Sequence, residues 1–190
     1  MAGRPAVFFD LHGTLGTARG DPYGDFPEFT WYANAAEAVR LVNQAGLRAI
    51  AITNQGPIAH GRFTLDDFWK RMAELEAELR EAGANLDAVY CCPHSRADGC
   101  PCCKPRTALA DEACRKFQIE PELSYVVGDR GDFDMLLASA IGARGVLVRT
   151  GEGEGSLGQF RETWADVEPA HVAEDVLEAV RWILADSTAV

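Results

Sequence analysis

Four short motifs carry side chains that could bind and transfer a phosphoryl group. In chain order they are Asp10, Thr53-Asn54-Gln55, Lys104-Pro105 and Gly128-Asp129-Arg130. A carboxylate such as that of Asp10 can attack phosphorus and form a covalent aspartyl-phosphate. The hydroxyl of Thr53 can donate a hydrogen bond to a phosphate oxygen, and Lys104 supplies positive charge where negative charge builds up during transfer. Each motif alone is common in turns and helix caps, but together they predict phosphoryl-transfer chemistry.

Several acidic residues among these motifs could hold a divalent cation. A cation would be needed because the attacking carboxylate and the phosphate repel each other. Mg²⁺ prefers oxygen ligands and keeps several of its waters. Asp10 and Asp129 supply carboxylates, and either Asp132 or Asp134 could hold the waters. The sequence therefore predicts a magnesium site beside the nucleophile.

A cluster of cysteines indicates a second metal site. Five of the six cysteines fall between Cys91 and Cys103, which core packing alone does not explain. The cluster contains two closely spaced ligand pairs, Cys92-x-His94 and Cys100-x-Cys102. A Cys₃His set suits tetrahedral Zn²⁺, and four protein ligands leave no open position, so the expected role is structural. Zinc would fix a loop over 91–104 that has little apolar content, whereas the alternative is a reduced, metal-free loop.

Strands and helices are predicted to alternate around these motifs. Strands are expected over 6–9, 47–52, 88–91, 124–128 and 145–148. Helices are expected over 35–45, 64–83, 107–117, 133–141 and 169–186. The helix over 64–83 begins with acidic residues in its first turn and carries an apolar stripe of Phe68, Met72, Leu75 and Leu79. The segments over 16–33 and 151–168 are expected to be a small flap and a mobile loop.

Alternating strands and helices predict an α/β fold with a parallel sheet covered by helices on both faces. In such folds ligands bind at the carboxyl ends of the strands. Each of the four phosphoryl-transfer motifs follows a predicted strand or precedes a helix at that edge. We therefore expect their side chains to converge at one edge of the sheet in a single domain over 1–190.

Composition limits the classes of partner. The chain has 190 residues and a formal net charge of −11, which makes it a poor candidate for binding nucleic acid. It contains no apolar run of about 18 residues, so no membrane association is expected. The first predicted strand begins close to Met1, which leaves no room for a signal peptide and favours a cytoplasmic location. The expected partner is a small-molecule phosphate ester, and the chain is expected to be a monomer or a small homo-oligomer.

The motifs resemble those of a known superfamily. Asp10-Leu11-His12-Gly13-Thr14 is similar to motif I, Asp-x-Asp-Gly-Thr, of the haloacid dehalogenase (HAD) superfamily, and the other three resemble motifs II to IV. The segments over 53–64 and 100–105, with Cys92-Pro93-His94, further resemble the D-glycero-D-manno-heptose 1,7-bisphosphate 7-phosphatases and the related histidinol-phosphate phosphatases. The resemblance extends from about Arg4 to Gly151.

The resemblance implies a Rossmann-like HAD fold without a large cap domain. It also implies a Mg²⁺-dependent phosphomonoesterase of carbohydrate metabolism that forms an aspartyl-phosphate on Asp10. The first expected substrate is a heptose bisphosphate and the second is histidinol phosphate. By this resemblance the backbone carbonyl of His12 and the carboxylate of Asp129 bind Mg²⁺. The spacing seen elsewhere in the superfamily ranks Asp134 above Asp132 as the further acidic ligand.

The main departure from the family is His12, which replaces the aspartate that serves as general acid and base. Imidazole is a competent acid and base near neutral pH, but it is bulkier than a carboxylate. Three outcomes follow: a working phosphatase that uses His12, a slow enzyme whose phosphoenzyme persists, or an inactive relative that still binds phosphate. A DNA-end phosphatase has related motifs, but it would need a basic groove that the net charge of −11 disfavours.

A second departure concerns the substrate side of the site. The family commonly has arginine where this chain has His60 and Cys103. Nearby residues could compensate for both losses. The expected substrate-binding residues are Asn54, Arg62, Arg106 and Arg130.

Overall fold

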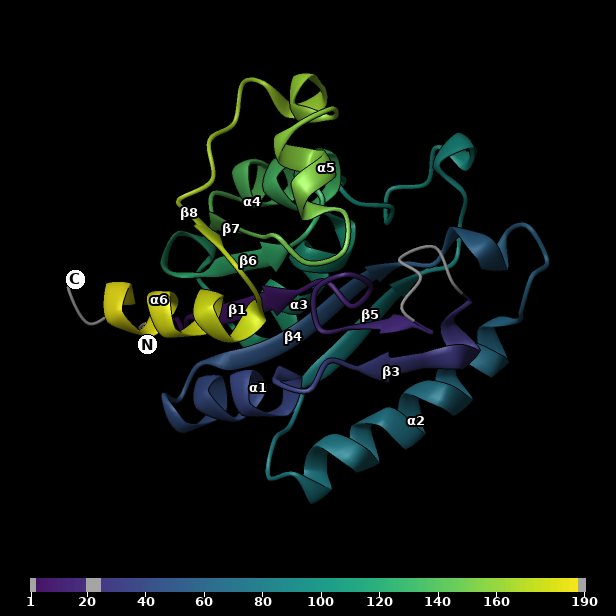
Figure 1. Cartoon of the computed structure of the whole chain (residues 1–190), viewed down its shortest axis with the longest axis horizontal. Coiled ribbons are helices and arrows are strands. Elements are labelled where there is room, and N and C mark those ends of the chain that lie inside the picture. The colour runs from purple at the N-terminus through teal and green to yellow at the C-terminus, as the bar shows by residue number, and fades with distance from the viewer. Residues whose placement is uncertain (1–2, 20–24, 188–190) are drawn as a thin grey trace.

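A sheet of six parallel strands forms the centre of the protein in its computed structural model, which describes residues 3–19 and 25–187 (Figure 1). The strands lie in the order β5-β4-β1-β6-β7-β8. Their bounds are Ala6–Phe9 (β1), Arg48–Asn54 (β4), Ala88–Cys92 (β5), Tyr125–Gly128 (β6), Arg144–Val148 (β7) and His171–Ala173 (β8). The prediction of a parallel sheet built from alternating strands and helices is confirmed.

Strand β1 shows why the sheet is covered on both faces. All four of its residues, Ala-Val-Phe-Phe, are buried, as expected for a central parallel strand. Because successive side chains point to opposite faces, Val7 and Phe9 pack into one core cluster and Ala6 and Phe8 into the other. The strand pairs with β4 on one side and β6 on the other, which aligns the ends of all three strands.

Helices cover both faces of the sheet, as predicted. On one face lie α1 (Ala35–Gln44), α2 (Leu65–Glu81) and α6 (Val176–Ser187), and on the other lie α3 (Ala108–Phe117) and α4 (Leu136–Ile141). Helix α2 begins at a capping box, in which Thr64 and Asp67 each accept a hydrogen bond from the other's backbone N–H. Its predicted apolar stripe is buried in the first core cluster.

The chain after β7 differs from the prediction in two places. Residues 169–186 were expected to form one helix, but His171–Ala173 pairs with β7 as the parallel strand β8. Helix α6 begins only at Val176, because the Asp175 carboxylate accepts the N–H groups of Leu177 and Glu178 and fixes the first turn there.

The expected irregular loop over 151–168 contains α5 (Gly153–Leu157) and a 3₁₀ helix at Arg161–Trp164. Its order comes from Trp164, which is buried against Met135 and Leu147 and donates its indole N–H to the carbonyl of Ser156 at 3.0 Å. The prediction of a mobile loop therefore misses two short helices, which make up half of this segment.

The predicted flap over 16–33 contains a small antiparallel pair of strands. Strand β2 (Gly16–Ala18) pairs with β3 (Phe29–Trp31), with a 3₁₀ helix at Phe26–Glu28 just before β3. Residues 20–24 of the flap lie outside the described residues. Phe26 and Phe29 stack on each other, and Phe26 also packs on Phe68 of α2, so the flap is attached to the core.

Among the residues that the structure describes, no helix is both long enough and apolar enough to cross a membrane.

Candidate functional site

The predicted phosphoryl-transfer residues meet at the carboxyl ends of β1, β4 and β6. They line a cavity of about 130 Å³. Its lining residues are Asp10, His12, Thr53, Asn54, Lys104, Asp129, Arg130, Phe133, Asp134 and Glu152. The convergence follows from the strand order, because β1 lies directly between β4 and β6.

Three buried carboxylates form the centre of the site. Oxygen atoms of Asp10, Asp129 and Asp134 lie within 4.8 Å of one another. Their residues are only 9%, 3% and 1% exposed. Asp134 sits in a single turn of π-helix, Gly131–Met135, that leads into α4. This turn brings Asp134 rather than Asp132 close to Asp10, in line with the ranking inferred from motif spacing.

Lys104 joins two of these carboxylates. Its ammonium donates to Asp10 Oδ1 at 2.6 Å and to Asp134 Oδ1 at 2.7 Å. Burial alone would lower the pKa of Lys104, but the two carboxylates outweigh burial and raise that pKa above its ordinary value. Lys104 is therefore a fixed positive charge between the predicted nucleophile and a predicted metal ligand.

The acidic groups carry more negative charge than Lys104 can balance. Burial, and then the charges of Asp10 and Asp134, raise the pKa of Asp129 well above its ordinary value. Burial also raises the pKa of Asp134 to about 6, against the opposing effect of Lys104. Clustered oxygen donors with excess negative charge fit a hard divalent cation such as Mg²⁺, so the donor set agrees with the predicted site.

The loop after β7 closes over Asp129. The backbone N–H of Glu152 donates to Asp129 Oδ2 at 2.8 Å. Gly13 and Gly151 have φ angles of +80° and +58°, and a Cβ atom on either would lie 2.1 or 2.3 Å from the same oxygen. Both positions therefore require glycine. Sequence analysis missed Gly151 and Glu152, although a glycine three residues after the end of a strand at this edge was an available signal.

Two polar residues of the motif at the end of β4 orient other groups of the site. Gln55 donates its side-chain amide to Thr53 Oγ1 at 2.9 Å, which fixes the position of that hydroxyl. Asn54 binds the main chain of Lys104 through both side-chain atoms, at 2.9 and 3.2 Å. Asn54, which was predicted to bind substrate, lines the cavity and also positions Lys104 through these contacts.

His12 lies in the cavity wall on the side of the flap. Its imidazole ring meets Phe29 edge-on at a centroid distance of 5.1 Å and Phe26 at 5.9 Å. The ring is partly buried between the flap and the cavity. The flap therefore contributes to the environment of the predicted acid and base.

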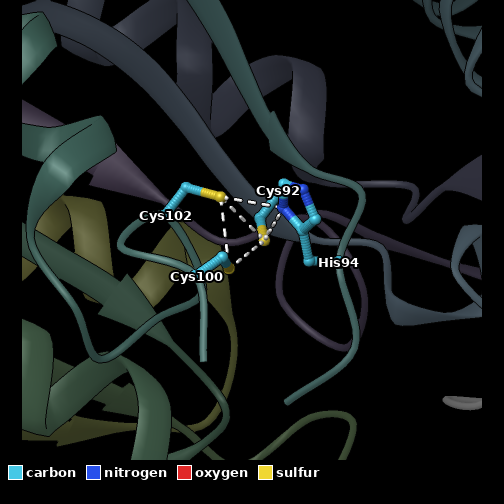
Figure 2. A group of neighbouring side chains, drawn as sticks. All are labelled: Cys92, His94, Cys100 and Cys102. Carbon is cyan, nitrogen blue, oxygen red and sulfur yellow. Dashed lines mark hydrogen bonds between the residues drawn. The ribbon is translucent and has the colours of Figure 1, made fainter. Parts of the chain in front are cut away.

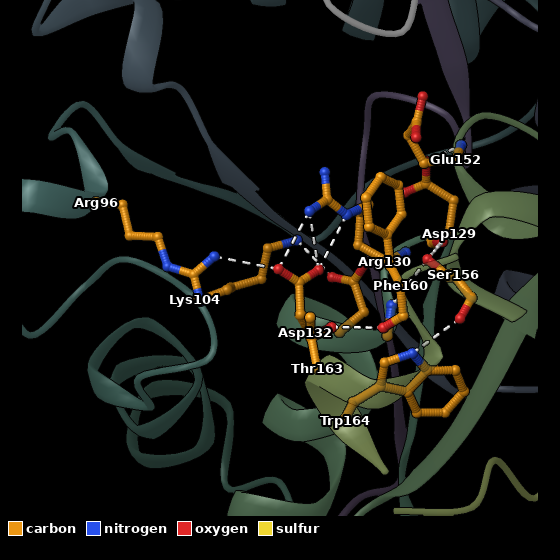
Figure 3. Close-up of polar contacts among 12 residues, drawn as sticks. Arg96, Lys104, Asp129, Arg130, Asp132, Glu152, Ser156, Phe160, Thr163 and Trp164 are labelled. Carbon is orange, nitrogen blue, oxygen red and sulfur yellow. Dashed lines mark hydrogen bonds and ion pairs between the residues drawn. The ribbon is translucent and has the colours of Figure 1, made fainter. Parts of the chain in front are cut away.

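Two of the arginines predicted to bind substrate lie outside the cavity lining. Arg62 pairs with Asp25 at 2.9 Å, and Arg106 donates to the carbonyl of Cys100 at 2.6 Å. The guanidinium of Arg62 therefore binds within the flap. The guanidinium of Arg106 binds the loop over 91–104, here called the cysteine loop. Arg130 does line the cavity, as predicted, and it binds the carboxylate of Asp132 (Figure 3).

The Cys₃His set comes together as predicted (Figure 2). Among Cys92, Cys100 and Cys102, the S···S distances are 3.6, 3.2 and 3.4 Å. His94 Nδ1 lies 3.7 and 3.2 Å from the sulfurs of Cys92 and Cys102. Zinc bonded at about 2.3 Å to sulfur and 2.0 Å to nitrogen would separate tetrahedral ligands by about 3.5–3.8 Å.

The four side chains could therefore hold one metal ion. Their separations exceed the roughly 2.05 Å of a disulfide, and all six cysteines are free thiols. Burial opposes ionisation of Cys100, but hydrogen bonds from the Cys102 side chain and backbone lower its pKa to about 7. Cys91 and Cys103 lie outside the set, which agrees with the resemblance.

Comparison with known proteins finds heptose bisphosphate phosphatases among the relatives of this chain. A family model described as HAD-hydrolase-like matches residues 101–179. A D-glycero-beta-D-manno-heptose-1,7-bisphosphate 7-phosphatase of Yersinia pestis is 32% identical over 169 residues, which cover 84% of this chain and 88% of the relative. A protein of the same name from Haemophilus influenzae is 34% identical over 79% of this chain and 87% of the relative.

Solved structures agree with these relatives. The D,D-heptose 1,7-bisphosphate phosphatase of B. bronchiseptica, solved with magnesium and phosphate, has a TM-score of 0.85 and 25% identity. That alignment covers 96% of this chain and 99% of the other. A HAD-like phosphatase from Mesorhizobium loti has a TM-score of 0.77 and 26% identity over 100% of this chain and 88% of the other.

Proposed function

Since the chain belongs to the HAD phosphatase family that includes the heptose bisphosphate phosphatases, we propose that it hydrolyses one phosphate ester of a small sugar bisphosphate. The relatives named above act on D-glycero-beta-D-manno-heptose 1,7-bisphosphate, which makes a heptose bisphosphate the first candidate. The observation that carries the proposal is the contact of Lys104 with both Asp10 and Asp134, beside Asp129, in a cavity at the sheet edge.

In the first step, the carboxylate of Asp10 attacks phosphorus and the bond from phosphorus to the sugar oxygen breaks. The phosphoryl group becomes an aspartyl-phosphate, and the sugar oxygen leaves as an alcohol after it takes a proton. Lys104 and the Thr53 hydroxyl are placed to bind the phosphoryl oxygens, because both line the cavity around Asp10. Gln55 keeps the Thr53 hydroxyl in that position.

His12 supplies and removes the protons. In its protonated form it gives a proton to the leaving sugar oxygen, and in its neutral form it takes one from the water that attacks the aspartyl-phosphate. The second step releases inorganic phosphate and restores both Asp10 and His12. Support for this role comes from the position of the imidazole in the cavity wall, held by Phe26 and Phe29.

The acidic cluster would hold Mg²⁺ through Asp10, Asp129 and Asp134, with the backbone carbonyl of His12 as a further ligand by resemblance. The cation would supply positive charge that offsets the repulsion between Asp10 and the phosphate. The raised pKa of Asp129, caused by burial and its acidic neighbours, supports this because a cation would stabilise the ionised carboxylates.

The Cys₃His set would hold Zn²⁺ in a structural role. Four protein ligands leave no open position for substrate. The loop that carries them ends directly before Lys104, so a fixed loop would also fix the lysine.

The direct test is phosphate release in the presence of Mg²⁺. The panel contains heptose 1,7-bisphosphate, histidinol phosphate and simple sugar monophosphates. We expect selective release from the bisphosphate and a loss of about 10³-fold or more in Asp10→Asn, because the nucleophile is removed. Asp66→Asn, an exposed change of the same kind on α2, is the matched control and should keep full activity. Selective release of phosphate from histidinol phosphate would identify that compound, and not a sugar bisphosphate, as the substrate. Full activity of Asp10→Asn would exclude the mechanism.

A further inference from the structure

Arg96 reaches from the cysteine loop to the edge of the active-site cavity. It lies in a 3₁₀ helix, Arg96–Asp98, between the two pairs of metal ligands. Its guanidinium donates to Asp132 Oδ2 at 3.1 Å (Figure 3). It also stacks 5.0 Å from the centroid of the Phe133 ring. Phe133 is part of the cavity lining. The Arg96 side chain is 67% exposed, so it stands at the mouth of the cavity.

A second guanidinium shares the same two partners. Arg130 binds Asp132 through Nε at 3.0 Å and through its second terminal nitrogen at 3.1 Å, and it stacks 4.8 Å from the Phe133 ring. Asp132 is buried, with its side chain only 7% exposed. One buried carboxylate and one ring thus hold two arginines from segments that are far apart in the sequence.

The resulting cluster, Arg96-Arg130-Asp132, carries more positive than negative charge. Two guanidiniums face one carboxylate, in a chain whose net charge is −11. A guanidinium has five N–H donors, so pairing with Asp132 does not exhaust its capacity to bind an anion. Its planar fork also matches two oxygens of a phosphate. Such an excess of positive charge at the mouth of an otherwise acidic cavity is suited to binding an anionic group of the substrate.

The cluster also supplies a guanidinium in place of the two arginines that the family commonly has at the positions of His60 and Cys103. Cys103, which stands where an arginine is common, is buried, and its thiol lies 3.6 Å from the carbonyl of Lys104. His60, at the other such position, is exposed and outside the cavity lining. Arg96 brings a guanidinium to the cavity mouth from a different part of the chain.

We propose that Arg96, together with Arg130, binds the second phosphate of a bisphosphate substrate while the first is held over Asp10. This inference rests on the proposed phosphatase function and names the residues that would bind the second phosphate of its proposed bisphosphate substrate. Arg96 is a specificity residue in this account, and it ties the cysteine loop to substrate binding through Asp132.

The test compares two substrates that share the bond to be broken. Heptose 1,7-bisphosphate and heptose 7-phosphate differ only in the second phosphate. For Arg96→Gln we expect KM for the bisphosphate to rise by about 10-fold or more, kcat to change little, and the constants for the monophosphate to stay the same. Arg96→Lys should recover part of the effect, because it keeps the charge but not the fork.

Arg115→Gln is the matched control, since this arginine is exposed on α3 and outside the cavity lining. Metal content and thermal melting of each variant show whether the cysteine loop is intact. Equal losses on both substrates, or no change on either, would overturn the role of Arg96 while leaving the phosphatase function in place.

If the wild type hydrolyses neither substrate, the proposed function fails, and calorimetric binding of the bisphosphate then decides the role of Arg96. Weaker binding by Arg96→Gln than by Arg115→Gln would support an anion site at the cavity mouth. Equal binding by the two variants would exclude it.

Discussion

At the scale of single residues, Lys104 links the predicted nucleophile to the predicted metal ligands. Burying a charge is costly unless it is paired and hydrogen-bonded. Here the buried ammonium meets Asp10 at 2.6 Å and Asp134 at 2.7 Å, and Asn54 fixes its main chain. The geometry of the nucleophile therefore depends on a lysine that lies almost a hundred residues away, at the end of the cysteine loop.

His12 gives the sharpest prediction at this scale. His12→Ala should lower kcat by about 10²–10⁴-fold, the usual contribution of a general acid and base. His12→Asp, which restores the residue common in the family, should keep activity well above that of His12→Ala. The measurement is kcat for heptose 1,7-bisphosphate under saturating Mg²⁺.

The matched control is His60→Ala, an exposed histidine outside the cavity lining, which should leave kcat unchanged. Full activity of His12→Ala would remove His12 from the proton transfers. A gain in His12→Asp over a nearly inactive wild type would instead indicate a relative that binds phosphate but turns over poorly.

Some of these residues could be predicted from the sequence and some could not. Asp10, Thr53, Lys104 and Asp129 follow or precede regular elements in a fixed order, and that order places them at one edge of a parallel sheet. The pairing of Arg96 with Asp132 joins residues 36 positions apart and depends on how two loops lie in space. No periodicity or motif in the sequence carries that information.

At the scale of elements, the cysteine loop connects the Cys₃His set to the proposed active site. Its ligands come from the end of β5 and the turn before α3. The contacts that join it to the cavity include the Arg96–Asp132 pair, the stacking of Arg96 on Phe133 and the binding of the Lys104 main chain by Asn54. A change in the structure of the cysteine loop should therefore shift Lys104 and, through its contact with Asp10, the carboxylate of Asp10.

Loss of the metal ligands should lower both stability and activity. For Cys100→Ser we expect the bound zinc to fall well below one ion per chain and Tm to drop by about 5 °C or more. Phosphatase activity should fall in parallel, because Lys104 loses its support. Zinc content by atomic emission, thermal melting and phosphate release measure the three effects.

Cys114→Ser is the matched control, because this thiol lies on α3 outside the Cys₃His set. It should keep both zinc and activity. A purified wild type that holds no zinc when folded and active would contradict the structural role of the site.

The elements that the sequence misassigned are short or lack a clear signal. Strand β8 has only three residues, and its valine and alanine also fit a helical stripe. The segment over 151–168 is rich in glycine, yet Trp164 orders it by packing into a separate cluster with Met135 and Leu147. Burial of a single large side chain outweighs local propensity here.

At the scale of the whole molecule, the strand order creates the site. Strand β1 lies between β4 and β6 (Figure 1). Those two strands bring their motifs to either side of Asp10, and the loop after β7 covers Asp129. The alternation of apolar strands and amphipathic helices predicted this architecture, because each element must bury its apolar face. The flap and the cysteine loop lie beyond the sheet, and contacts between distant segments decide their placement.

The most direct test of the account asks whether the phosphoryl group passes through Asp10. The enzyme is mixed with heptose 1,7-bisphosphate and Mg²⁺ and quenched in acid within one turnover, and its peptides are then examined by mass spectrometry. His12→Ala is run in parallel because it should slow hydrolysis of the phosphoenzyme. The account predicts one phosphoryl group on the peptide that contains Asp10, and none in Asp10→Asn. Turnover with the phosphoryl group on another residue, or undiminished turnover by Asp10→Asn, would contradict it.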